Sequence, residues 1–364
     1  MKKFNKKILI ATGGTGGHIF PAYSLAEHMI KQGIQIKITT DKRGLKFIKN
    51  YKNLDIKVIN TDTIFKKNPI IFIISLFKIS FAFLNALYLL LVYKPNIVFG
   101  MGGYSSFPIC IAAKLLNIPF IIYENNLIIG KANKYLLPYA HKFFTAYPMS
   151  EKISEKYHKK TLRIGNIIRQ NIINFKNKKI IYEQNQINIL ILGGSQAAKV
   201  FAEKLPKIFE ECIKKEELKI KIFQQCTPEQ NEELKKVYTL LNIEHEIFNF
   251  SENILDFFVK TDLAITRSGA SMLAELLNCN IPFISIPLPS SADNHQLKNA
   301  EYFEKLGCGF LIKEENMSKD LFQLIKLIHK DKDLLNQVKS TQIKYSDKEV
   351  FRKIDNQIKE KIDE

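Results

Sequence analysis

The sequence predicts an α/β protein of GT-B type: two Rossmann-like units in tandem, each a doubly wound parallel sheet covered by helices. Three observations support this fold class. Strand-like and helix-like segments alternate along the chain, an order typical of parallel sheets flanked by helices. A glycine-rich turn joins strand to helix near the start, and a similar turn recurs about half a chain later. A length of 364 residues also favours two domains over one.

The composition is that of a globular protein with an excess of positive charge. Hydrophobic residues make up 46% and charged residues 25%, and the formal net charge is +18. This charge favours an anionic partner, either nucleic acid or a membrane surface, while the abundance of Lys, Ile and Asn throughout permits a purely compositional origin. Because no basic module with interleaved aromatic residues is present, we expect no nucleic-acid partner.

Cysteine usage and the N-terminus indicate a protein of the cytoplasm. The five cysteines lie far apart without a C-x-x-C pair, which argues for a reducing compartment and against a zinc site. The basic N-terminus lacks the apolar core of a signal peptide. Asp331 and Asp333 form a D-x-D, but in a lysine-rich helical stretch typical of a solvated face. We therefore expect no metal and no cofactor.

The first glycine-rich turn follows the apolar run 8–11 and contains four glycines before His18. Pro21 suits the first turn of the next helix, and Gly33 is placed to end it. The glycines let the backbone approach a ligand and direct amide N–H groups toward a phosphate or a developing oxyanion. At the lip of the turn, the His18 imidazole could take a proton from an attacking hydroxyl. A plain glycine turn is the alternative.

The segment 64–93 is the most apolar part of the chain. We expect strands at 34–39 and 55–59 with a helix at 44–52 between them, and then a crossover helix that leads to a strand at 97–99. Lys78 divides the apolar segment into pieces shorter than the roughly 20 residues that a membrane span needs. A lipid interface suits part of its surface, with a buried helix as the alternative. The residues of this patch are Phe72, Ile73, Leu76 and Phe77, beside Lys66, Lys67 and Lys78.

Two further loops belong to the same rim of the first sheet. A second glycine loop, 100–106, follows the strand at 97–99, and Glu124 and Asn126 follow the strand at 120–123. Parallel strands place their carboxyl ends at one edge, where ligands bind in open α/β sheets. A carboxylate there favours a role in the site, while turn capping is the alternative for the asparagines.

An internal repeat marks the second unit. The stretch 188–196 again runs from a strand through a glycine loop into a helix, and 279–284 repeats the sequence pattern of 116–121. We place the join near 163–166. The predicted domains are therefore 1–165 and 166–345, with a polar C-terminal helix, 346–364, that packs back on the first domain and has little core of its own.

The second unit offers groups suited to a nucleotide diphosphate. The strand 262–266 leads into small residues that begin a helix, which is an anion site made of backbone amides. Glu275 could accept hydrogen bonds from both ribose hydroxyls, and Arg169 could bind a diphosphate bidentately. A second cradle lies at Gly194 and Ser195. The polar run 293–296 could contact a sugar, and a solvated loop is its alternative.

Together these motifs resemble the MurG family of inverting N-acetylglucosaminyltransferases. The resemblance runs from about residue 7 to 310 and rests on Gly13–Ala22, Gly100–Tyr104, Gly193–Gln196, Arg267–Ala270 with Glu275, and Asp293–Gln296. It implies two domains facing a cleft, with the acceptor on the first and UDP-GlcNAc mainly on the second. The implied reaction transfers GlcNAc to the muramyl 4-hydroxyl of lipid I, giving lipid II for peptidoglycan.

The resemblance also implies roles for individual residues. His18 would be the base, and Glu124 a second catalytic candidate. Thr15, Gly16 and Gly17 would lie near both substrates. Tyr104 and Asn126 would line the acceptor side. The donor would be held by Arg169, Ser195, Ser251, Ala270, Ser271, Met272, Leu273, Ala274, Glu275 and Gln296.

Four departures from the family pattern keep alternatives open. Tyr123 replaces the histidine of H-E-Q-N, Ile167 replaces the proline of G-N-P-x-R, and Ala197 ends the motif G-G-S-Q-G. The usual H-Q appears as Gln224 and Gln225. The alternatives are a GT-B transferase acting on another lipid, such as diacylglycerol, and a membrane-associated protein that binds a sugar nucleotide without turnover. The resemblance places the protein at the cytoplasmic face of the membrane, on its anionic surface, with cell-wall synthesis proteins as further partners.

Overall fold

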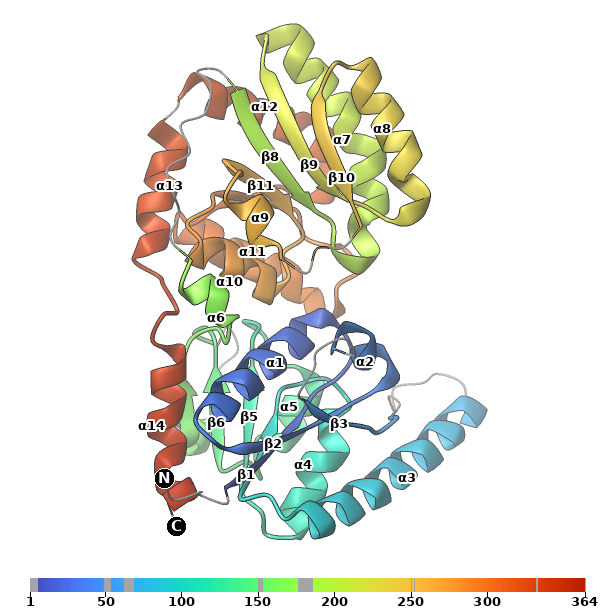
Figure 1. The fold of residues 1–364 in the computed structure, drawn as a ribbon, viewed down its shortest axis with the longest axis vertical. Coiled ribbons are helices and arrows are strands. Elements are labelled where there is room, and N and C mark those ends of the chain that lie inside the picture. Colours follow the sequence, from blue (N-terminus) through green and yellow to red (C-terminus); the bar gives the residue numbers. More distant parts are fainter. Residues whose placement is uncertain are drawn as a thin grey trace. The chain divides into compact units, whose positions relative to one another are not determined.

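The computed structural model describes residues 6–48, 54–61, 69–149, 153–175, 186–249, 251, 253–331 and 333–363 (Figure 1). Within these ranges, nothing is said of the side chains of 69–72, 195–198 and 360–363. The chain divides into two compact units: unit 1 is Met1–Gln170 with Asp347–Glu364, and unit 2 is Asn171–Ser346. The sequence-based boundaries fell at 165 and 345.

Unit 1 contains a seven-stranded sheet in which all the paired strands are parallel, in the order β3-β2-β1-β4-β5-β6-β7. Short apolar runs form these strands because both faces of the sheet are covered by helices. The strands are β1 (Lys7–Ala11), β2 (Gln35–Thr40), β3 (Asp55–Val58), β4 (Ile97–Gly100), β5 (Phe120–Glu124), β6 (Lys142–Thr145) and β7 (Thr161–Arg163).

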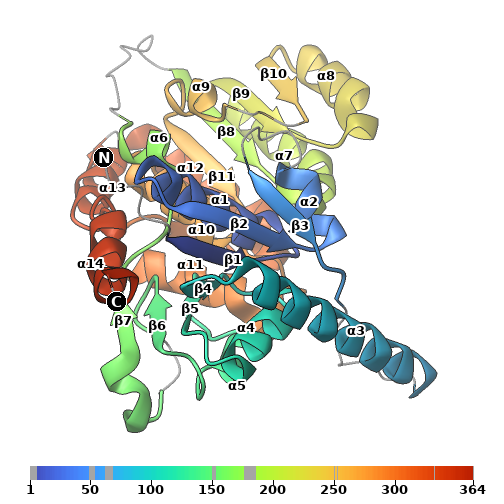
Figure 2. The same ribbon diagram turned by 60° about the horizontal axis from the view of Figure 1, so that its bottom comes forward.

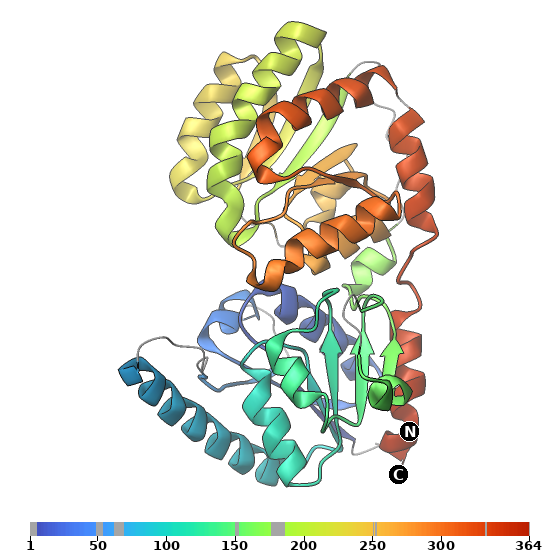
Figure 3. The same ribbon diagram turned by 180° about the vertical axis from the view of Figure 1, so that it is seen from behind.

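Helices cover both faces of this sheet (Figures 1 and 3). Side chains from α3, α4 and α5 join those of the central strands in one hydrophobic core. The helices of unit 1 are α1 (Gly16–Lys31), α2 (Lys42–Ile48), α3 (Pro69–Tyr93), α4 (Ser106–Leu115), α5 (Lys131–Leu136), the 3₁₀ helix η1 (Glu155–Lys160) and α14 (Val350–Asp363). Helix α6 (Gln170–Ile173) spans the division between the units.

Unit 2 contains a six-stranded parallel sheet, in the order β10-β9-β8-β11-β12-β13. Side chains of α7, α8 and α12 pack with its strands in one core. The strands are β8 (Gln186–Leu192), β9 (Lys219–Gln225), β10 (Glu244–Phe248), β11 (Leu263–Thr266), β12 (Phe283–Ser285) and β13 (Phe310–Leu311). The helices are α7 (Gly194–Glu216), η2 (Pro228–Gln230), α8 (Asn231–Leu240), α9 (Leu255–Phe258), α10 (Ala270–Asn278), η3 (Ala292–Asn294), α11 (His295–Lys305), η4 (Glu314–Asn316), α12 (Met317–Lys330) and α13 (Asp333–Ile343). The predicted fold class, two parallel-sheet units of Rossmann type, is confirmed.

Three sequence-based expectations are corrected. Helix α1 begins at Gly16, so Pro21 lies inside it rather than in its first turn. Helix α2 begins at Lys42, two residues before the predicted start, and the predicted residues 49–52 lie outside the described residues. The C-terminal helix α14 has a buried apolar stripe where little core was expected, because its hydrophobic residues recur at helical spacing. These residues are Val350, Phe351, Ile354 and Ile358.

Helix α14 packs on α1 within unit 1. The His28 ring stacks on Phe351 with centroids 4.3 Å apart, and its Nε2 lies 3.0 Å from both carboxylate oxygens of Asp355. At the other side of the helix, Lys142 Nζ donates to the Gln357 carbonyl at 2.9 Å. These contacts attach α14 to the first sheet and its helices.

Helix α3 is the predicted crossover helix, and it is a single helix of 25 residues. Ala82, Ala86 and Leu90, spaced four residues apart, are buried against the core of unit 1. By length and composition alone, the stretch Ile73–Tyr93 could cross a membrane. Within an 18-residue segment of it, 22% is buried inside the protein. Figure 2 shows the amino-terminal half of α3 extending past α4. Ile73, Leu76 and Phe77 are exposed there, whereas Lys66, Lys67 and the Phe72 side chain lie outside the described residues.

Candidate active site

The loops predicted to carry function in unit 1 all follow the carboxyl ends of strands of its sheet. The first glycine turn follows β1, the second follows β4, and Glu124 ends β5. The Met101 N–H donates to the Ala11 carbonyl at 2.8 Å, so the first two loops begin side by side. The structure therefore brings these three predicted segments together at one edge, as the parallel topology requires.

Asp41 fixes the first glycine turn. Its Oδ1 accepts hydrogen bonds from Gly14 N at 3.1 Å and Gly44 N at 2.8 Å, and Arg43 donates to its Oδ2. Burial by itself would raise the pKa of this carboxyl, but the hydrogen bonds from Gly44, Gly14 and Arg43 outweigh it, and the pKa lies below its usual value. The charged carboxylate therefore holds the turn at neutral pH.

The second glycine loop packs against the ring of His18. A side chain at Gly102 would place its Cβ 2.9 Å from the His18 ring, and one at Gly103 would meet the Gly13 carbonyl at the same distance. Both glycines also have positive φ, +88° and +76°, which disfavours other residues. His18 itself is half-buried at the start of α1. The two loops thus leave a space that fits one imidazole ring.

Asn125 compensates for Pro21 inside α1. Proline has no N–H to donate to the carbonyl four residues before it, which is that of Gly17. Asn125 Nδ2 donates to that carbonyl instead, at 2.8 Å. The loop after β5 is therefore tied to the helix that carries His18, although Asn125 was not among the predicted site residues.

Glu124 is surrounded by donors of its own chain. Its side chain is 2% exposed, and Asn126 donates to Oε1 from both its backbone and its side-chain nitrogen at 3.1 Å. Gly130 N and Asn133 Nδ2 donate to Oε2 at 2.9 and 3.0 Å. A carboxylate with four such donors holds the loop after β5 in one conformation.

Two departures from the family pattern meet in space. The buried Tyr123 hydroxyl donates to the Gly165 carbonyl at 3.3 Å and accepts the Ile167 N–H at 3.1 Å. Burial raises the pKa of this phenol, so it stays protonated. A proline at 167 could not supply the N–H that Tyr123 accepts. The tyrosine and the isoleucine therefore form one hydrogen-bonded pair.

The remaining predicted residues of unit 1 have varied surroundings. Thr15 is exposed and immediately precedes α1, whose first two residues are Gly16 and Gly17. Tyr104 is 37% exposed in the second glycine loop. Arg169, predicted in the second domain, belongs to unit 1, and its guanidinium lies 5.9 Å from the centroid of the Phe20 ring on α1.

In unit 2, the predicted anion site is the start of α10. Gly269 is its N-cap, and Ser271 and Met272 in the first turn are half-buried. Glu275 is buried further along the helix, at 5% exposure. Ala270, Leu273 and Ala274 are also buried, at 4%, 0% and 0%, so their side chains serve packing and their backbone is what a ligand at this end could meet.

Arg267 fastens the loops around this helix. The side chain is 6% exposed, and Nη1 donates to the carbonyls of Ile286 and Pro287 at 3.2 and 3.1 Å. It also pairs with Glu314, and its guanidinium lies 4.9 Å from the Phe201 ring centroid. A buried guanidinium with these partners orders the carboxyl edge of the second sheet.

Gln296 and Asn299 complete this arrangement. Gln296 Oε1 accepts the Leu288 N–H at 3.0 Å, and this hydrogen bond does not use the side-chain nitrogen of Gln296. Asn299 Nδ2 donates to the Ser268 carbonyl at 3.1 Å. Ser251 is half-buried beyond β10. Ser195 and Ala197 lie in α7, but their side chains are outside the described residues.

Comparison with known proteins assigns the family. The model of the glycosyltransferase family 28 N-terminal domain matches residues 8–145, and that of the family 28 C-terminal domain matches residues 188–358. The chain belongs to glycosyltransferase family 28. It is a glycosyltransferase with the GT-B fold, as the sequence predicted.

Relatives resemble the chain over nearly its whole length. A relative from Pelagibacter ubique is 36% identical over 91% of this chain and 92% of its own, and one from Rickettsia canadensis is 37% identical over 92% of each. Both are named UDP-N-acetylglucosamine–N-acetylmuramyl-(pentapeptide) pyrophosphoryl-undecaprenol N-acetylglucosamine transferase. The crystal structure of MurG from Acinetobacter baumannii matches with a TM-score of 0.78 and 26% identity, covering 98% of this chain and 99% of that one.

Asp41, Asn125 and Arg267 order the loops of this family 28 enzyme but were not predicted as site residues. Asp41 and Arg267 directly follow the strands β2 and β11. Their place at the carboxyl end of a strand is the one feature of the sequence that could have indicated a role in the site. Their hydrogen-bond partners lie up to 47 residues away along the chain. Among the residues that the structure describes, no group of three His, Cys, Asp or Glu side chains could hold a metal ion.

Proposed function

We propose that this enzyme transfers GlcNAc from UDP-GlcNAc to the muramyl 4-hydroxyl of lipid I, with inversion at the sugar C1, to form lipid II. The observation that carries the proposal is the close packing of the two glycine loops around the His18 ring. Two glycine loops leave room for one imidazole at the carboxyl edge of a parallel sheet, the edge at which such folds bind ligands. The names of the relatives from Pelagibacter ubique and Rickettsia canadensis support the choice of donor and acceptor.

His18 acts as the general base in this proposal. Neutral imidazole removes the proton of the acceptor hydroxyl as its oxygen forms a bond to C1 of GlcNAc. The bond between C1 and the diphosphate oxygen breaks, and UDP leaves with the electron pair. Gly102 and Gly103 pack closely against the His18 ring and hold it in place, and a side chain at either position would displace it.

We assign Glu124 a positioning role within the same site. Its oxygens already accept four hydrogen bonds from Asn126, Gly130 and Asn133, and losing its charge would weaken all of them. Glu124 then orients Asn126, and with Tyr104 that side chain contacts the acceptor. Thr15, Gly16 and Gly17 offer backbone N–H groups to the lipid diphosphate.

Unit 2 binds the nucleotide in this proposal. The N-terminus of α10 stabilises the negative charge of the leaving diphosphate. Arg169, which belongs to unit 1, is the further cation that the sequence predicted for the diphosphate. Glu275 accepts hydrogen bonds from the ribose hydroxyls, and the side-chain nitrogen of Gln296 donates to GlcNAc. Ser195 and Ser251 complete the set of nucleotide contacts.

The acceptor is a lipid, so the enzyme must work at a membrane surface. We propose that α3 lies in the interface of the cytoplasmic leaflet rather than across the bilayer. Its inner row, Ala82, Ala86 and Leu90, is committed to the core of unit 1, and α3 connects two strands of one sheet. Its outer face is apolar, with Phe77, Phe81, Leu84 and Tyr88 between 61% and 73% exposed.

The test is release of UDP with three acceptor conditions: a lipid I analogue, diacylglycerol and no acceptor. The proposal predicts release with the lipid I analogue alone. Release with diacylglycerol alone would establish a different lipid acceptor, and binding of UDP-GlcNAc without release under any condition would establish a non-catalytic protein. Each of these two results would overturn the proposal.

A further inference from the structure

Arg43 lies beside the first glycine turn of unit 1, on the side of β2. Its Nε and Nη2 both donate to Asp41 Oδ2, at 3.0 and 2.8 Å, while Asp41 Oδ1 accepts the Gly14 N–H. A Cβ added to Gly14 would stand 3.8 Å from Arg43 Nη2, which is an ordinary contact distance. The guanidinium is therefore held next to the backbone of the turn.

The start of α2 is packed tightly where it carries this arginine. Gly44 is buried, and a Cβ there would overlap Thr40 Oγ1 and lie 2.5 Å from Ile19 Cδ1 of α1. Glycine therefore lets the start of α2 approach α1 closely. The Gly44 N–H also donates to Asp41 Oδ1 at 2.8 Å, so the carboxylate that orients Arg43 is itself fixed.

Arg43 stays open to solvent although it is paired. Its side chain is 68% exposed, whereas the Asp41 side chain is 6% exposed. A guanidinium has five N–H donors, and the two bonds to Asp41 use two of them. The planar fork of the remaining donors matches two oxygens of a phosphate. Arg43 can therefore bind an anionic ligand while it keeps its bonds to Asp41.

The glycine loops of unit 1 and the loop after β5 supply no cation of their own. Residues 12–15, 101–105 and 125–130, which follow β1, β4 and β5, contain no lysine or arginine. The diphosphate of the proposed acceptor carries full negative charges, whereas backbone N–H groups offer only partial positive charges. Arg43 supplies a formal positive charge beside the first of these loops.

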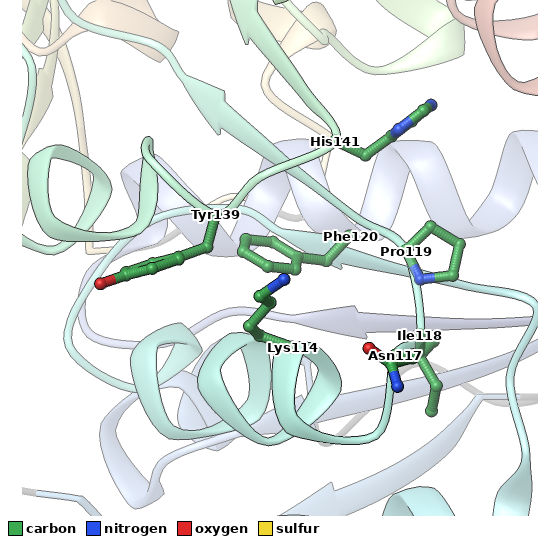
Figure 4. Close-up of a pocket in the computed structure, with 7 residues that line it drawn as sticks. All are labelled: Lys114, Asn117, Ile118, Pro119, Phe120, Tyr139 and His141. Carbon is green, nitrogen blue, oxygen red and sulfur yellow. The ribbon is translucent and has the colours of Figure 1, made fainter.

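The lysine of the pocket in unit 1 lies at the opposite edge of the sheet. This pocket of about 450 Å³ opens where α4 ends and β5 begins, and Figure 4 shows Lys114 among the residues that line it. Strand β5 begins at Phe120 and ends at Glu124, so the pocket lies at the amino edge. Arg43 and His18 lie at the carboxyl edge, and a ligand beside them does not reach Lys114.

Arg43 and His18 lie on opposite sides of the first glycine turn. Strand β1 lies between β2 and β4 in the sheet. Arg43 follows β2, and the His18 ring packs against Gly102 and Gly103 after β4. An acceptor with its hydroxyl at His18 and its charged group at Arg43 therefore extends across the turn.

We propose that Arg43 binds the diphosphate of the acceptor and thereby makes the enzyme prefer a lipid diphosphate to an uncharged lipid such as diacylglycerol. Arg43 donates to the phosphate oxygens through its guanidinium, and Asp41 positions it. The inference rests on the proposed function, because lipid I is the acceptor that brings a diphosphate to this turn. It adds a residue that determines acceptor specificity.

Initial rates with a short-chain lipid I analogue test this role. We expect Arg43→Ala to raise the KM for the analogue about tenfold, the effect of losing a charged contact that is partly exposed to solvent. The kcat and the KM for UDP-GlcNAc should not change. Arg43→Lys, which keeps the charge but not the planar fork, should raise the KM about threefold. Arg352→Ala is the matched control, because Arg352 is also an exposed arginine of unit 1 paired with a carboxylate, and it should leave the KM unchanged.

Two further acceptors separate binding of the diphosphate from other roles. A muramyl pentapeptide with a neutral alkyl group in place of the lipid diphosphate presents no phosphate to Arg43, so Arg43→Ala and the wild type should have equal kcat/KM for it. Equal losses on the charged and the neutral acceptor would mean that Arg43 only supports the turn, and the proposal would be wrong. An acceptor with the diphosphate but no peptide should keep the full effect of Arg43→Ala. If the effect disappears with this acceptor, Arg43 pairs with a peptide carboxylate and the assignment to the diphosphate is wrong.

Calorimetry with geranyl diphosphate gives a readout that needs no turnover. The titration is done with saturating UDP, which occupies the nucleotide site proposed for unit 2. Geranyl diphosphate is expected to bind the wild type about tenfold more tightly than Arg43→Ala. Equal affinities, or no binding to the wild type, would overturn the proposal. If the expected difference is found but the wild type releases no UDP with the lipid I analogue, the diphosphate site at Arg43 stands and the proposed function fails.

Discussion

The two units share one parallel-sheet module but secure its carboxyl edge with opposite kinds of side chain. In unit 1, the Asp41 carboxylate accepts from loop amides, and Asn125 takes over a carbonyl that Pro21 leaves without an intrahelical donor. In unit 2, the buried Arg267 guanidinium donates to loop carbonyls. The first arrangement presents an imidazole, His18, and the second presents the start of α10. The chemistry of each edge therefore depends on the few side chains that fix its loops.

The amino edges of the two sheets also differ by a single atom type. In unit 1, Asn96 N donates to the Lys7 carbonyl and Asn96 Oδ1 accepts the Lys7 N–H, both at 2.8 Å. In unit 2, Asp262 makes the same pair of bonds with Asn188, at 3.0 and 2.9 Å. Unit 1 therefore uses an exposed neutral amide where unit 2 uses a half-buried carboxyl group.

The largest effect is expected at His18, which we propose as the general base. His18→Ala should lower kcat by about 10²- to 10⁴-fold, the usual contribution of a general base. Initial rates with UDP-GlcNAc and a lipid I analogue measure it. His158→Ala replaces an exposed histidine of the same unit and should leave kcat unchanged. Equal kcat values for His18→Ala and the wild type would show that His18 is not the general base.

Arg267→Met removes the buried guanidinium that holds the loops of unit 2 in place. The loss of the guanidinium leaves Glu314 and two loop carbonyls without their donor, so we expect the free energy of unfolding to fall by about 3 kcal/mol. Chemical denaturation measures it. Arg352→Met breaks an ion pair with Glu349 whose side chains are 73% and 56% exposed, and should change stability by less than about 0.5 kcal/mol. Equal effects of the two substitutions would show that Arg267 does not order its edge.

The Tyr123–Ile167 pair stabilises unit 1 through two buried hydrogen bonds. Tyr123→Phe leaves the Ile167 N–H and the Gly165 carbonyl without a partner and should cost about 2 kcal/mol. In an Ile167→Pro background the same change should cost less, because that N–H is already gone. A double-mutant cycle of unfolding free energies gives the difference. Additive effects would mean that the two departures from the family pattern arose independently.

The smallest effect is expected at Asp262, and it depends on pH. Burial raises the pKa of this carboxyl to about 6, against the opposing effects of the Asn188 N–H and Lys339. Because the folded pKa is raised, the stability present below the unfolded pKa of about 3.9 is lost as the pH rises through about 6. Asp262→Asn, which copies Asn96 of unit 1, should therefore add about 1 kcal/mol at pH 8, after allowance for partial exposure. It should add nothing at pH 4.

Thermal unfolding of Asp262→Asn at pH 4 and pH 8 separates the two expectations. Asn96→Asp provides the reciprocal variant and should change stability little at pH 8, because position 96 is exposed and the new carboxylate stays hydrated. A variant Asp262→Asn that is less stable than the wild type at pH 8 would contradict the account.

Much of the fold could be predicted because its signals are local. Apolar runs that end in glycine, such as 8–11 and 188–192, mark strands and their loops, and the parallel topology then places those loops at one edge. Strands β6, β7, β9, β10 and β13 have no counterpart among the predicted elements. Two of them have three residues or fewer, and a short run carries little periodicity.

The supports of the candidate site could not be predicted, because they depend on contacts distant in sequence. Pro21 lies inside α1 since Asn125, more than a hundred residues away, takes over the Gly17 carbonyl. Likewise, Tyr123 and Ile167 could be recognised as departures but not as partners. Sequence patterns indicate which loops could bind a ligand, and the tertiary structure determines what holds them.

The division of chemistry between the units is tested most directly by UDP affinity, measured by calorimetry in His18→Ala and Arg267→Met under identical conditions. We expect His18→Ala to bind UDP as the wild type does, whereas Arg267→Met, kept below its unfolding temperature, should lose about tenfold in affinity. Loss of UDP affinity in His18→Ala together with unchanged affinity in Arg267→Met would contradict it.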